Sequence, residues 1–263
     1  MNIIHTIIIS IIEGLTEFLP ISSTAHMDIA RVVLSVPSSE FIKSFEIIIQ
    51  LGAILAVVIL YAKKVFSSWL YIRNLIIAFI PTGIIGFILY KLIKSFLLGN
   101  IWVEALALLI GGIIIILFEN YQSRRNQTQS EKIKLEDLTF KQLITLGIAQ
   151  ALAVIPGVSR SGAVIISGRA LGLGRELITE FSFLLAVPTM LSATLYEVYK
   201  TGFSFSSSEW GTISLGFIIS FVVAIFVIKW FLEYIRKHTF KIFGWYRIIL
   251  GCILIIALFL GFL

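Results

Sequence analysis

Six long apolar stretches restrict what this chain can fold into. Each is roughly the length of about 20 residues that an α-helix needs to cross the hydrocarbon core of a bilayer. They cover residues 41–61, 71–90, 101–118, 177–199, 212–230 and 242–263. Of the 263 residues, 58% are hydrophobic and only 14% are charged, whereas soluble domains carry about 25% charged residues. The sequence therefore predicts an all-α integral membrane protein with six transmembrane helices and excludes a water-soluble globular domain.

Two further apolar stretches are interrupted by proline and polar residues. Residues 3–19 lead into Pro20 and a run of hydroxyl residues, and residues 143–155 lead into Pro156 and a second polar run. A second apolar run follows each interruption. The halves are short for a span, and broken backbone at membrane depth needs hydrogen bonds from protein or from a wet cavity. We expect two re-entrant helix–loop–helix hairpins; the alternative is ordinary helices joined by surface loops.

The two interrupted stretches resemble one motif used twice. Three pairs of residues share a single offset along the chain, namely Pro20 with Pro156, Ser23 with Ser159 and Phe45 with Phe181. Three expected spans separate the hairpins, so the hairpins would enter from opposite membrane faces, as in an inverted-topology repeat. We expect a first repeat at 1–118, a cytoplasmic linker at 119–140 and a second repeat at 141–263. A shared site would then lie near the membrane midplane.

Basic residues predict the orientation. The loops on one side hold most of the Lys and Arg, among them Lys63, Arg124 and Arg236, and the positive-inside rule makes that side cytoplasmic. The first hairpin and both termini would then face outside. The net charge is +6, but the basic residues lie in short loops between apolar stretches, which suits anionic lipid rather than nucleic acid. Residues 1–10 have neither a basic leader nor a cleavage site, so we expect no removable signal peptide.

Glu13 and Glu17 lie one helical turn apart in the first interrupted stretch and therefore share a helix face. An ionised carboxylate at membrane depth is costly and is usually functional. Two neighbouring carboxylates repel each other unless a cation or an arginine joins them, and hard cations such as Mg²⁺ and Ca²⁺ take oxygen ligands. We expect a metal site here; the alternative is that Glu13 faces interfacial water.

Ser22, Ser23 and Thr24 follow Pro20 and would begin the second half of the first hairpin. They could cap a helix, and they could also bind a phosphate or supply a nucleophile, because a helix N-terminus favours anions. His26 follows about one turn later, and an imidazole can transfer protons near neutral pH. The alternative for His26 is a structural hydrogen bond.

The second polar run gives the strongest single indication of a ligand site. Its sequence is Pro156-Gly157-Val158-Ser159-Arg160-Ser161-Gly162. Gly157 and Gly162 allow backbone to approach a ligand closely, and the planar fork of Arg160 suits phosphate oxygens. With Ser159 and Ser161 beside the arginine, we expect an oxyanion or phosphate cradle. The alternative is that Arg160 reaches an interface.

Carboxylates on one hairpin and an arginine–serine cradle on the other suit a metal-bound phosphate or diphosphate. The membrane setting, without a soluble domain, indicates a lipid phosphate. Glu46, Gln50, Gln150 and Glu180 are further polar residues within apolar stretches, and we expect them to line a cavity or to support the site. Arg169 is expected to extend towards the cytoplasm.

Two long motifs resemble the signatures of a known family. They are Glu13-Gly14-Leu15-Thr16-Glu17-Phe18-Leu19-Pro20-Ile21-Ser22-Ser23-Thr24-Ala25-His26 and Pro156-Gly157-Val158-Ser159-Arg160-Ser161-Gly162. Both resemble the undecaprenyl-diphosphate phosphatase, or bacitracin-resistance protein, family, and the similarity runs through nearly the whole chain. The resemblance implies hydrolysis of a polyprenyl diphosphate to the monophosphate and inorganic phosphate, which recycles the lipid carrier of cell-wall glycans. It also implies a divalent cation, Mg²⁺ or Ca²⁺, in a plasma-membrane enzyme whose active site opens to the outer face.

The resemblance also implies roles for individual residues, by motif position. The catalytic residues would be Glu17, Ser23, His26 and Arg160. The substrate-binding residues would be Ser22, Thr24, Gly157, Ser159, Arg160, Ser161 and Gly162, and the metal ligands would be Glu13 and Glu17. Two positions depart from the family pattern, because Ala25 stands where Gly is usual and Val164 where Thr is frequent. The polyprenyl chain length is therefore left open.

A transporter or flippase for a phosphorylated lipid or anion is the competing interpretation, because inverted repeats with broken helices are also a transporter architecture. Two mechanisms stay open for the phosphatase, namely attack by a metal-activated water and a phosphoseryl intermediate. The expected partners are the polyprenyl diphosphate and the bilayer, without nucleic acid. A homodimer is one assembly that the sequence leaves open.

Overall fold

The computed structural model describes residues 1–92, 97, 99–124, 133–201 and 205–261, and this part of the chain is built from helices. Six of them are long and apolar enough to cross a bilayer. They are α3 (Glu40–Phe66), α4 (Trp69–Leu92), α5 (Ile101–Arg124), α8 (Arg175–Thr201), α9 (Ser207–Lys237) and α10 (Lys241–Phe259). The all-α class and the six expected long helices are confirmed.

Several of these helices extend beyond the apolar stretches that predicted them. The helix expected at 212–230 begins at Ser207, where Ser206 caps it: the backbone N–H of Glu209 donates to Ser206 Oγ at 3.3 Å, and Glu209 Oε2 accepts from the Ser206 backbone N–H at 2.8 Å. Polar caps and charged final turns add such residues outside the apolar core. Similarly, α5 continues to Arg124, past residue 119 where the linker was expected to begin. Residues 125–132 of that linker lie outside the described part of the chain.

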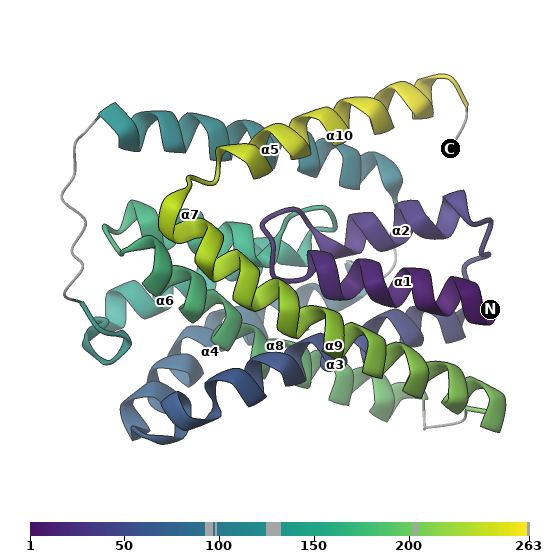
Figure 1. The fold of residues 1–263 in the computed structure, drawn as a ribbon, viewed down its shortest axis with the longest axis horizontal. Coiled ribbons are helices and arrows are strands. Elements are labelled where there is room, and N and C mark those ends of the chain that lie inside the picture. Colours follow the sequence, from purple (N-terminus) through teal and green to yellow (C-terminus); the bar gives the residue numbers. More distant parts are fainter. Residues whose placement is uncertain (93–96, 98, 125–132, 202–204, 262–263) are drawn as a thin grey trace.

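Four shorter helices form two helix–loop–helix hairpins. The first consists of α1 (Ile3–Thr16) and α2 (Ser23–Val33), and the second of α6 (Phe140–Ala151) and α7 (Arg160–Ala170), with short 3₁₀ turns at η2 (Leu135–Asp137) and η3 (Leu152–Val154). At 1.5 Å per residue these helices are about 16–21 Å long, short of the ~30 Å apolar thickness of a bilayer. In Figure 1 the α1–α2 hairpin opens towards the end that carries both termini, and the α6–α7 hairpin lies towards the opposite end. Their loops meet in the middle of the molecule.

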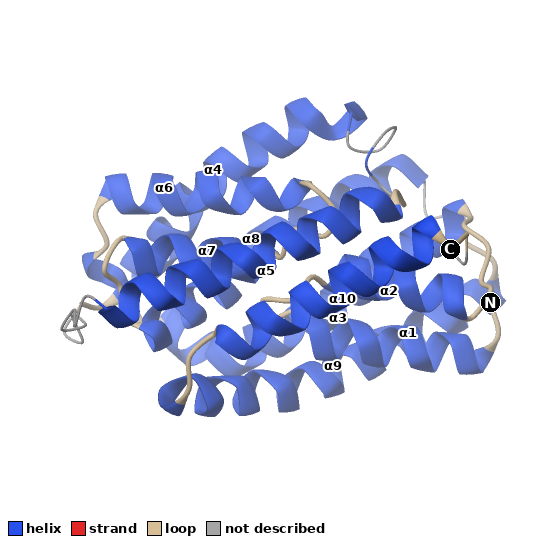
Figure 2. Ribbon diagram, turned by 90° about the horizontal axis from the view of Figure 1, so that it is seen from above, coloured by secondary structure: helices blue, strands red, loops and turns tan. Residues whose placement is uncertain are grey.

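The long helices surround the two hairpins. In Figures 1 and 2, α5 and α10 run side by side along one side of the molecule, and they pack closely against each other. On the other side α3 packs against α8 and α9, while α1 packs on α9 and α6 packs on α4. Each hairpin is thereby packed on one side against long helices, while apolar side chains such as Ile4 and Leu15 of α1 and Phe140 and Ile148 of α6 stay exposed.

A buried aromatic cluster fixes the first hairpin loop against the long helices. Phe18 lies directly after Glu17 and contacts Phe183 edge-to-face, with ring centroids 5.1 Å apart, and Phe183 in turn packs on Phe231. All three rings are fully buried. Such ring pairs stabilise a fold by roughly 0.5–1.5 kcal/mol beyond their area burial. The cluster therefore holds the loop that carries Glu17 in place from α8 and α9.

Candidate active site

The first hairpin loop begins where α1 ends at Thr16. Glu17 is the C-cap residue of α1, and the chain then turns through Pro20 to Ser22, whose φ of 72° is unusual for a residue with a side chain. Ser22 stands at the N-cap of α2 but makes no side-chain capping bond. Its hydroxyl lies 3.1 Å from the hydroxyl of Thr24 instead. Capping therefore does not account for the Ser22 hydroxyl.

The second hairpin loop leads into α7 through Ser159. Ser159 Oγ accepts a hydrogen bond from the backbone N–H of Gly162 at 3.1 Å and so caps the helix. Gly157 has a φ of 85°, and a Cβ there would lie 2.7 Å from the backbone of Glu104, so the loop needs glycine at this position. Close packing of this loop on α5 thus sets where α7 begins and where Arg160 stands.

The two loops are joined directly by hydrogen bonds. The hydroxyl of Ser161 donates to the backbone carbonyl of Leu19 at 2.8 Å, and the hydroxyl of Ser159 donates to the same carbonyl at 3.3 Å. The two serine oxygens are 3.0 Å apart. Ser159 and Ser161, predicted as phosphate ligands, therefore hold the first loop in this structure.

A buried ion pair links the two hairpins at the centre of the molecule. Arg160 Nη2 donates to Glu17 Oε1 at 3.0 Å, across 143 residues of sequence, and Arg160 Nη1 donates to the carbonyl of Ser182 at 2.7 Å. The hydroxyl of Ser23 donates to the other oxygen, Glu17 Oε2, at 2.6 Å. Arg160, Glu17 and Ser23 are all buried. The structure thus brings three of the predicted catalytic residues into one hydrogen-bonded unit, and Arg160 does not reach an interface.

A small cavity of about 60 Å³ adjoins this unit. Its polar lining includes Glu17, Ser22, Ser23, Thr24, Ser159 and Arg160, and Gln50 of α3 adds an amide. Acidic, hydroxyl and guanidinium groups therefore face one shared space at the meeting of two helix N-termini, an arrangement that suits a phosphate group.

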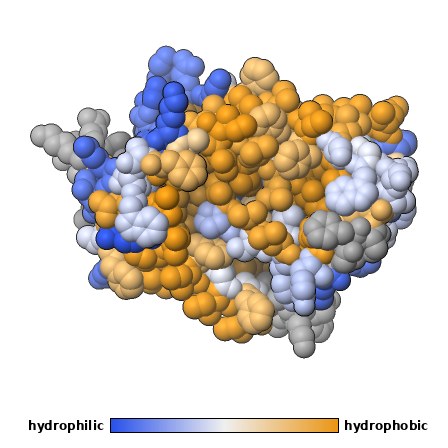
Figure 3. Space-filling view, turned by 90° about the horizontal axis from the view of Figure 1, so that it is seen from below, coloured by the Kyte–Doolittle hydropathy of each residue, from blue (hydrophilic) through white to orange (hydrophobic). Residues whose placement is uncertain are grey.

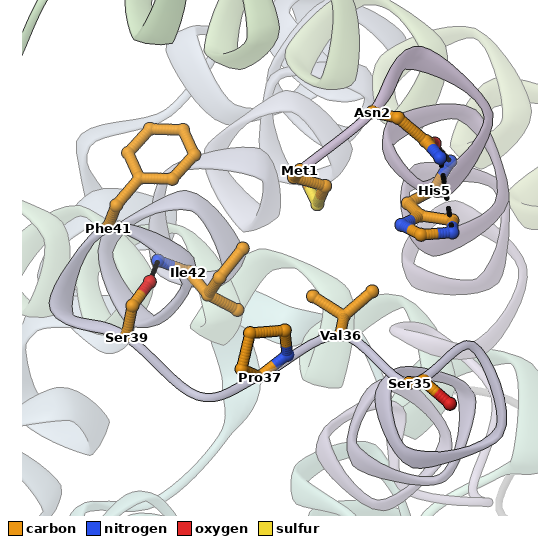
Figure 4. Close-up of a pocket in the computed structure, with 9 residues that line it drawn as sticks. All are labelled: Met1, Asn2, His5, Ser35, Val36, Pro37, Ser39, Phe41 and Ile42. Carbon is orange, nitrogen blue, oxygen red and sulfur yellow. Dashed lines mark hydrogen bonds between the residues drawn. The ribbon is translucent and has the colours of Figure 1, made fainter.

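A separate hollow of about 270 Å³ lies near the chain's N-terminus, between the start of α1, residues 35–37 and the start of α3 (Figure 4). His5 and Ser39 are among the residues that line it, and both are engaged locally: His5 pairs with Asn2, and Ser39 caps α3 by accepting from the backbone N–H of Ile42. None of the predicted site residues lines this hollow. The cavity at Arg160 is therefore the candidate active site.

The imidazole of His26 lies beside this site, with both ring nitrogens engaged. Nδ1 lies 2.6 Å from the carbonyl of Ser22, and Nε2 lies 2.7 Å from the hydroxyl of Tyr246. Because a carbonyl can only accept, Nδ1 carries the proton. In the neutral imidazole Nε2 then accepts from Tyr246, whose ring stacks on His26 with an interplanar angle of 10°. His26 is not among the residues that line the cavity.

Comparison with known proteins identifies the family. The family model for bacitracin resistance protein BacA matches residues 6–253. This chain belongs to the BacA family. It is 47% identical over 249 residues to the undecaprenyl-diphosphatase of Aquifex aeolicus, an alignment that covers 95% of this chain and 96% of that protein. It is also 46% identical over 251 residues to the undecaprenyl-diphosphatase of a Sulfurihydrogenibium species, covering 95% and 97% of the two chains. A relative of the same name from Campylobacter jejuni is 46% identical over 268 residues, covering 100% of this chain and 97% of its own.

Glu13 and Glu104 of this BacA family member are two fully buried carboxylates whose oxygens have no hydrogen-bond partner among the described residues, and Glu13 is the one that lies a helical turn before Glu17. Leaving a buried carboxylate without a partner is costly, so a proton or a cation is needed beside it.

Glu13 and Glu17 supply too few ligands to hold a divalent cation on their own. No cluster of three or more His, Cys, Asp or Glu side chains that could hold a metal occurs among the described residues. Mg²⁺, however, is commonly bound by one or two carboxylates together with the phosphates of a substrate. Glu17 lines the cavity and Glu13 does not, so a cation held by this pair would need further ligands from a bound phosphate.

Arg247 of α10 is a site residue that the sequence reasoning missed. It is 2% exposed and donates to the carbonyls of Pro20 at 3.2 Å, Gly157 at 3.0 Å and Ala107 at 2.9 Å. One guanidinium thus ties both hairpin loops to α5. A signal was present, because Arg247 is the only charged residue in the apolar stretch 242–263 and charges inside such stretches are usually functional. For Tyr246, an aromatic residue in an apolar stretch, the sequence offered no comparable signal.

The other polar residues expected near the site divide into different environments. Gln50 lines the cavity, and Gln150 donates to the hydroxyls of Thr82 and Thr189 at 3.2 and 2.8 Å. Glu46 lies 4.0 Å from Arg31, while Glu180 forms an ion pair with Lys64. These last two pairs lie outside the cavity lining.

The expectation for Arg169 was wrong. The side chain is buried, and it donates to the carbonyl of Leu173 at 2.9 Å and to Gln122 Oε1 at 3.2 Å. Protein acceptors at the end of α7 satisfy the guanidinium, so it has no need to extend to water.

Proposed function

We propose that this protein hydrolyses undecaprenyl diphosphate to undecaprenyl phosphate and inorganic phosphate. The proposal depends above all on one observation, the buried unit in which Arg160 and Ser23 both contact the carboxylate of Glu17 beside a small polar cavity. The shared name of the relatives supports the choice of substrate. A flippase has no comparable support from the relatives' names.

We also propose how the molecule sits in the membrane. The two hairpins are re-entrant, enter from opposite faces and belong to an inverted repeat of 1–118 and 141–263, with 119–140 as a cytoplasmic linker. The short helices, the opposite openings of the hairpins in Figure 1 and the basic residues at the linker end support this arrangement. The site then lies near the membrane midplane and opens to the outer face of the plasma membrane.

Arg160 binds and orients the terminal phosphate in this mechanism. Its guanidinium is held in place by Ser182 and Glu17, so its orientation is set before substrate arrives. A fixed cation beside the phosphate oxygens stabilises the charge that develops during phosphoryl transfer. Ser22 and Thr24, whose hydroxyls line the cavity, supply further hydrogen bonds to those oxygens.

Glu17 accepts the proton of the attacking group. Because the hydroxyl of Ser23 already donates to Glu17 Oε2 at 2.6 Å, its proton can pass to that oxygen as Ser23 Oγ attacks phosphorus. The bond between the terminal phosphorus and the bridging oxygen breaks, and that oxygen leaves with its electron pair as part of undecaprenyl phosphate. Water then hydrolyses the phosphoserine and restores the serine proton. In the alternative, Glu17 takes a proton from a water that attacks directly, and Ser23 only orients the carboxylate.

Glu13 and Glu17 would be the protein ligands of a divalent cation, Mg²⁺ or Ca²⁺, at the proposed site. When bound, it would neutralise charge on the diphosphate oxygens. His26, whose tautomer is held by Ser22 and Tyr246, would first have to take a proton at Nε2, in place of the hydrogen bond from Tyr246, before it could return that proton to the leaving oxygen.

Phosphate release by the purified protein tests the proposal. The wild type should release inorganic phosphate from undecaprenyl diphosphate, and Arg160→Ala and Glu17→Gln should each lower kcat/KM by about a hundredfold or more. The exposed residue Arg236 supplies the matched control, Arg236→Ala, which should keep full turnover. If a folded Arg160→Ala protein kept wild-type turnover, the assignment would be wrong. Trapping labelled phosphate on Ser23 under single-turnover conditions would decide between the two attacking groups.

A further inference from the structure

A second and larger cavity lies next to the candidate active site. This groove, of about 420 Å³, runs between α3, α4, α8 and η3. Its lining includes Phe79, Gly83, Gly86, Phe87, Val154 and Ala193. Phe87 is 74% exposed, so the groove reaches the outer surface of the helices. Figure 3 views the molecule from the side on which α3 and α4 lie, where the surface is largely apolar and is hollowed near its middle.

Three separate segments connect this groove to the candidate active site. On α3, Ile47 lines the groove and Gln50, one turn later, lines the small cavity at Arg160. On η3, Val154 lines the groove and the adjacent Ala153 lines the small cavity. On α8, Thr189 lines the groove and Met190 lines the small cavity. The two cavities therefore lie next to each other along three elements, α3, η3 and α8.

The groove offers little unused hydrogen-bonding capacity to a ligand. The hydroxyl of Thr82 donates to the carbonyl of Gly147, and that of Thr189 donates to the carbonyl of Leu185, each at 2.8 Å. The amide of Gln150 donates to both hydroxyls. Two further polar groups of the lining also have protein partners: the hydroxyl of Ser192 donates to the carbonyl of Pro188 at 2.7 Å, and the carboxylate of Glu197 accepts from the hydroxyl of Ser44 at 3.4 Å. Recognition in the groove therefore depends mainly on apolar contact, and its volume lies within the roughly 300–1,000 Å³ of small-molecule pockets.

We infer that the groove holds the head-proximal part of the substrate's polyisoprenoid chain while the diphosphate lies at Arg160. The inference rests on the proposed function and adds the site that selects the lipid. The substrate has a charged diphosphate, which suits the polar cavity at Arg160, and a long apolar chain, which suits the adjacent groove. The remainder of the chain leaves past Phe87 into the bilayer.

Gly86 sets the width of this groove. A Cβ built on Gly86 would have Val154 Cγ1 as its nearest neighbour, at 4.0 Å, so the first carbon of a larger side chain meets no clash at this position in the groove lining. Leucine also has a better helix propensity than glycine by up to about 1 kcal/mol, so Gly86→Leu should leave α4 folded. A matched control exists in Gly211 of α9, where a Cβ would meet no atom within 4 Å and which does not line the groove.

Steady-state kinetics give the first test. With undecaprenyl diphosphate in detergent, Gly86→Leu should raise KM about tenfold while kcat stays within about twofold, the pattern expected when a binding contact away from the reacting bond is lost. Gly86→Ala should have a smaller effect, and Gly211→Leu should match the wild type. An unchanged KM in Gly86→Leu would overturn the inference.

Photocrosslinking gives a second test that does not require turnover. The probe is a diazirine-bearing prenyl diphosphate in which a methylene group replaces the bridging oxygen, so that it cannot be hydrolysed. It should label peptides of α4 and α8 that line the groove, lose that labelling in Gly86→Leu, and keep it in Gly211→Leu. Excess undecaprenyl diphosphate should compete, and excess phosphatidylethanolamine should not. Labelling spread over the apolar surface, or displaced equally by phospholipid, would show that bulk lipid occupies the groove and would overturn the inference. Labelling of the groove by a protein that releases no phosphate would instead contradict the proposed function alone.

Discussion

Arg247 Nη1 donates to the backbone carbonyl of Pro20, so the last helix of the chain holds the first hairpin loop in position. The same guanidinium also contacts the carbonyls of Gly157 and Ala107. The side chain therefore connects both loops to α5 without lining the cavity at Arg160. Its proposed role is to position the loops.

The first prediction concerns this contact. Arg247→Met keeps much of the apolar stem but leaves buried carbonyls without a donor, which costs roughly 1–3 kcal/mol for each group. We expect a lower melting temperature in detergent and a fall in kcat of about tenfold or more, because the two loops lose their common anchor. Arg247→Lys should recover part of the stability and less of the activity, since one ammonium cannot reproduce the planar fork. Wild-type kcat in a folded Arg247→Met protein would contradict the positioning role.

The second prediction concerns Tyr246 and His26. Tyr246→Phe removes only the hydroxyl that lies 2.7 Å from His26 Nε2 and preserves the stacked ring. We expect kcat to fall by about threefold to tenfold with little change in melting temperature, because a hydrogen bond of this kind contributes roughly 0.5–1.5 kcal/mol. Tyr199→Phe is the matched control, since Tyr199 is 85% exposed. Equal kcat values for the two variants would show that the Tyr246 hydroxyl has no part in the reaction.

The third prediction concerns Glu13 and the proposed cation. Glu13→Gln replaces the carboxyl group with a neutral amide but keeps the shape of a fully buried side chain. If Glu13 and Glu17 share a cation with the substrate, the variant should need about tenfold more Mg²⁺ or Ca²⁺ for half-maximal turnover. The measurement is a titration of phosphate release against each cation after removal of bound metal by a chelator. An unchanged half-maximal concentration would assign Glu13 a role other than binding the metal.

The long helices were predictable because a bilayer demands a simple pattern. Some 20 consecutive apolar residues suffice to identify a span, and all six expected stretches became helices. Their ends were less predictable, because polar caps such as Ser206 with Glu209 lie outside the apolar pattern. The proximity of Glu17 and Arg160 was also expected, since each interrupts an apolar stretch and the two stretches share one motif.

Contacts that depend on tertiary packing were not predictable. Nothing local to α10 indicates that Arg247 reaches two loops or that Tyr246 stacks on His26, 220 residues away in the chain. Arg169 was misjudged for the same reason, because its acceptors, Gln122 and the carbonyl of Leu173, come together only when α5 and α7 pack. Ser159 and Ser161 were expected to face a ligand, and only the folded loop shows that both hydroxyls donate to Leu19.

The fourth prediction separates the structural from the chemical role of the central ion pair. Removing one partner of a buried pair leaves the other charge uncompensated, at a cost of roughly 3–5 kcal/mol, whereas replacing both with neutral groups is often nearly neutral. We therefore expect Arg160→Met and Glu17→Gln each to lower the melting temperature, and the double variant to recover most of that loss.

Phosphate release should not recover with stability, because the double variant has neither the cation that binds phosphate nor the carboxylate that accepts the proton. The measurement is a double-mutant cycle in melting temperature and in kcat/KM for the same four proteins. Additive losses of stability would contradict the pairing of the two charges seen at 3.0 Å. Recovery of turnover in the double variant would mean that the pair serves only to join the hairpins, and that the chemistry belongs to other residues around the cavity.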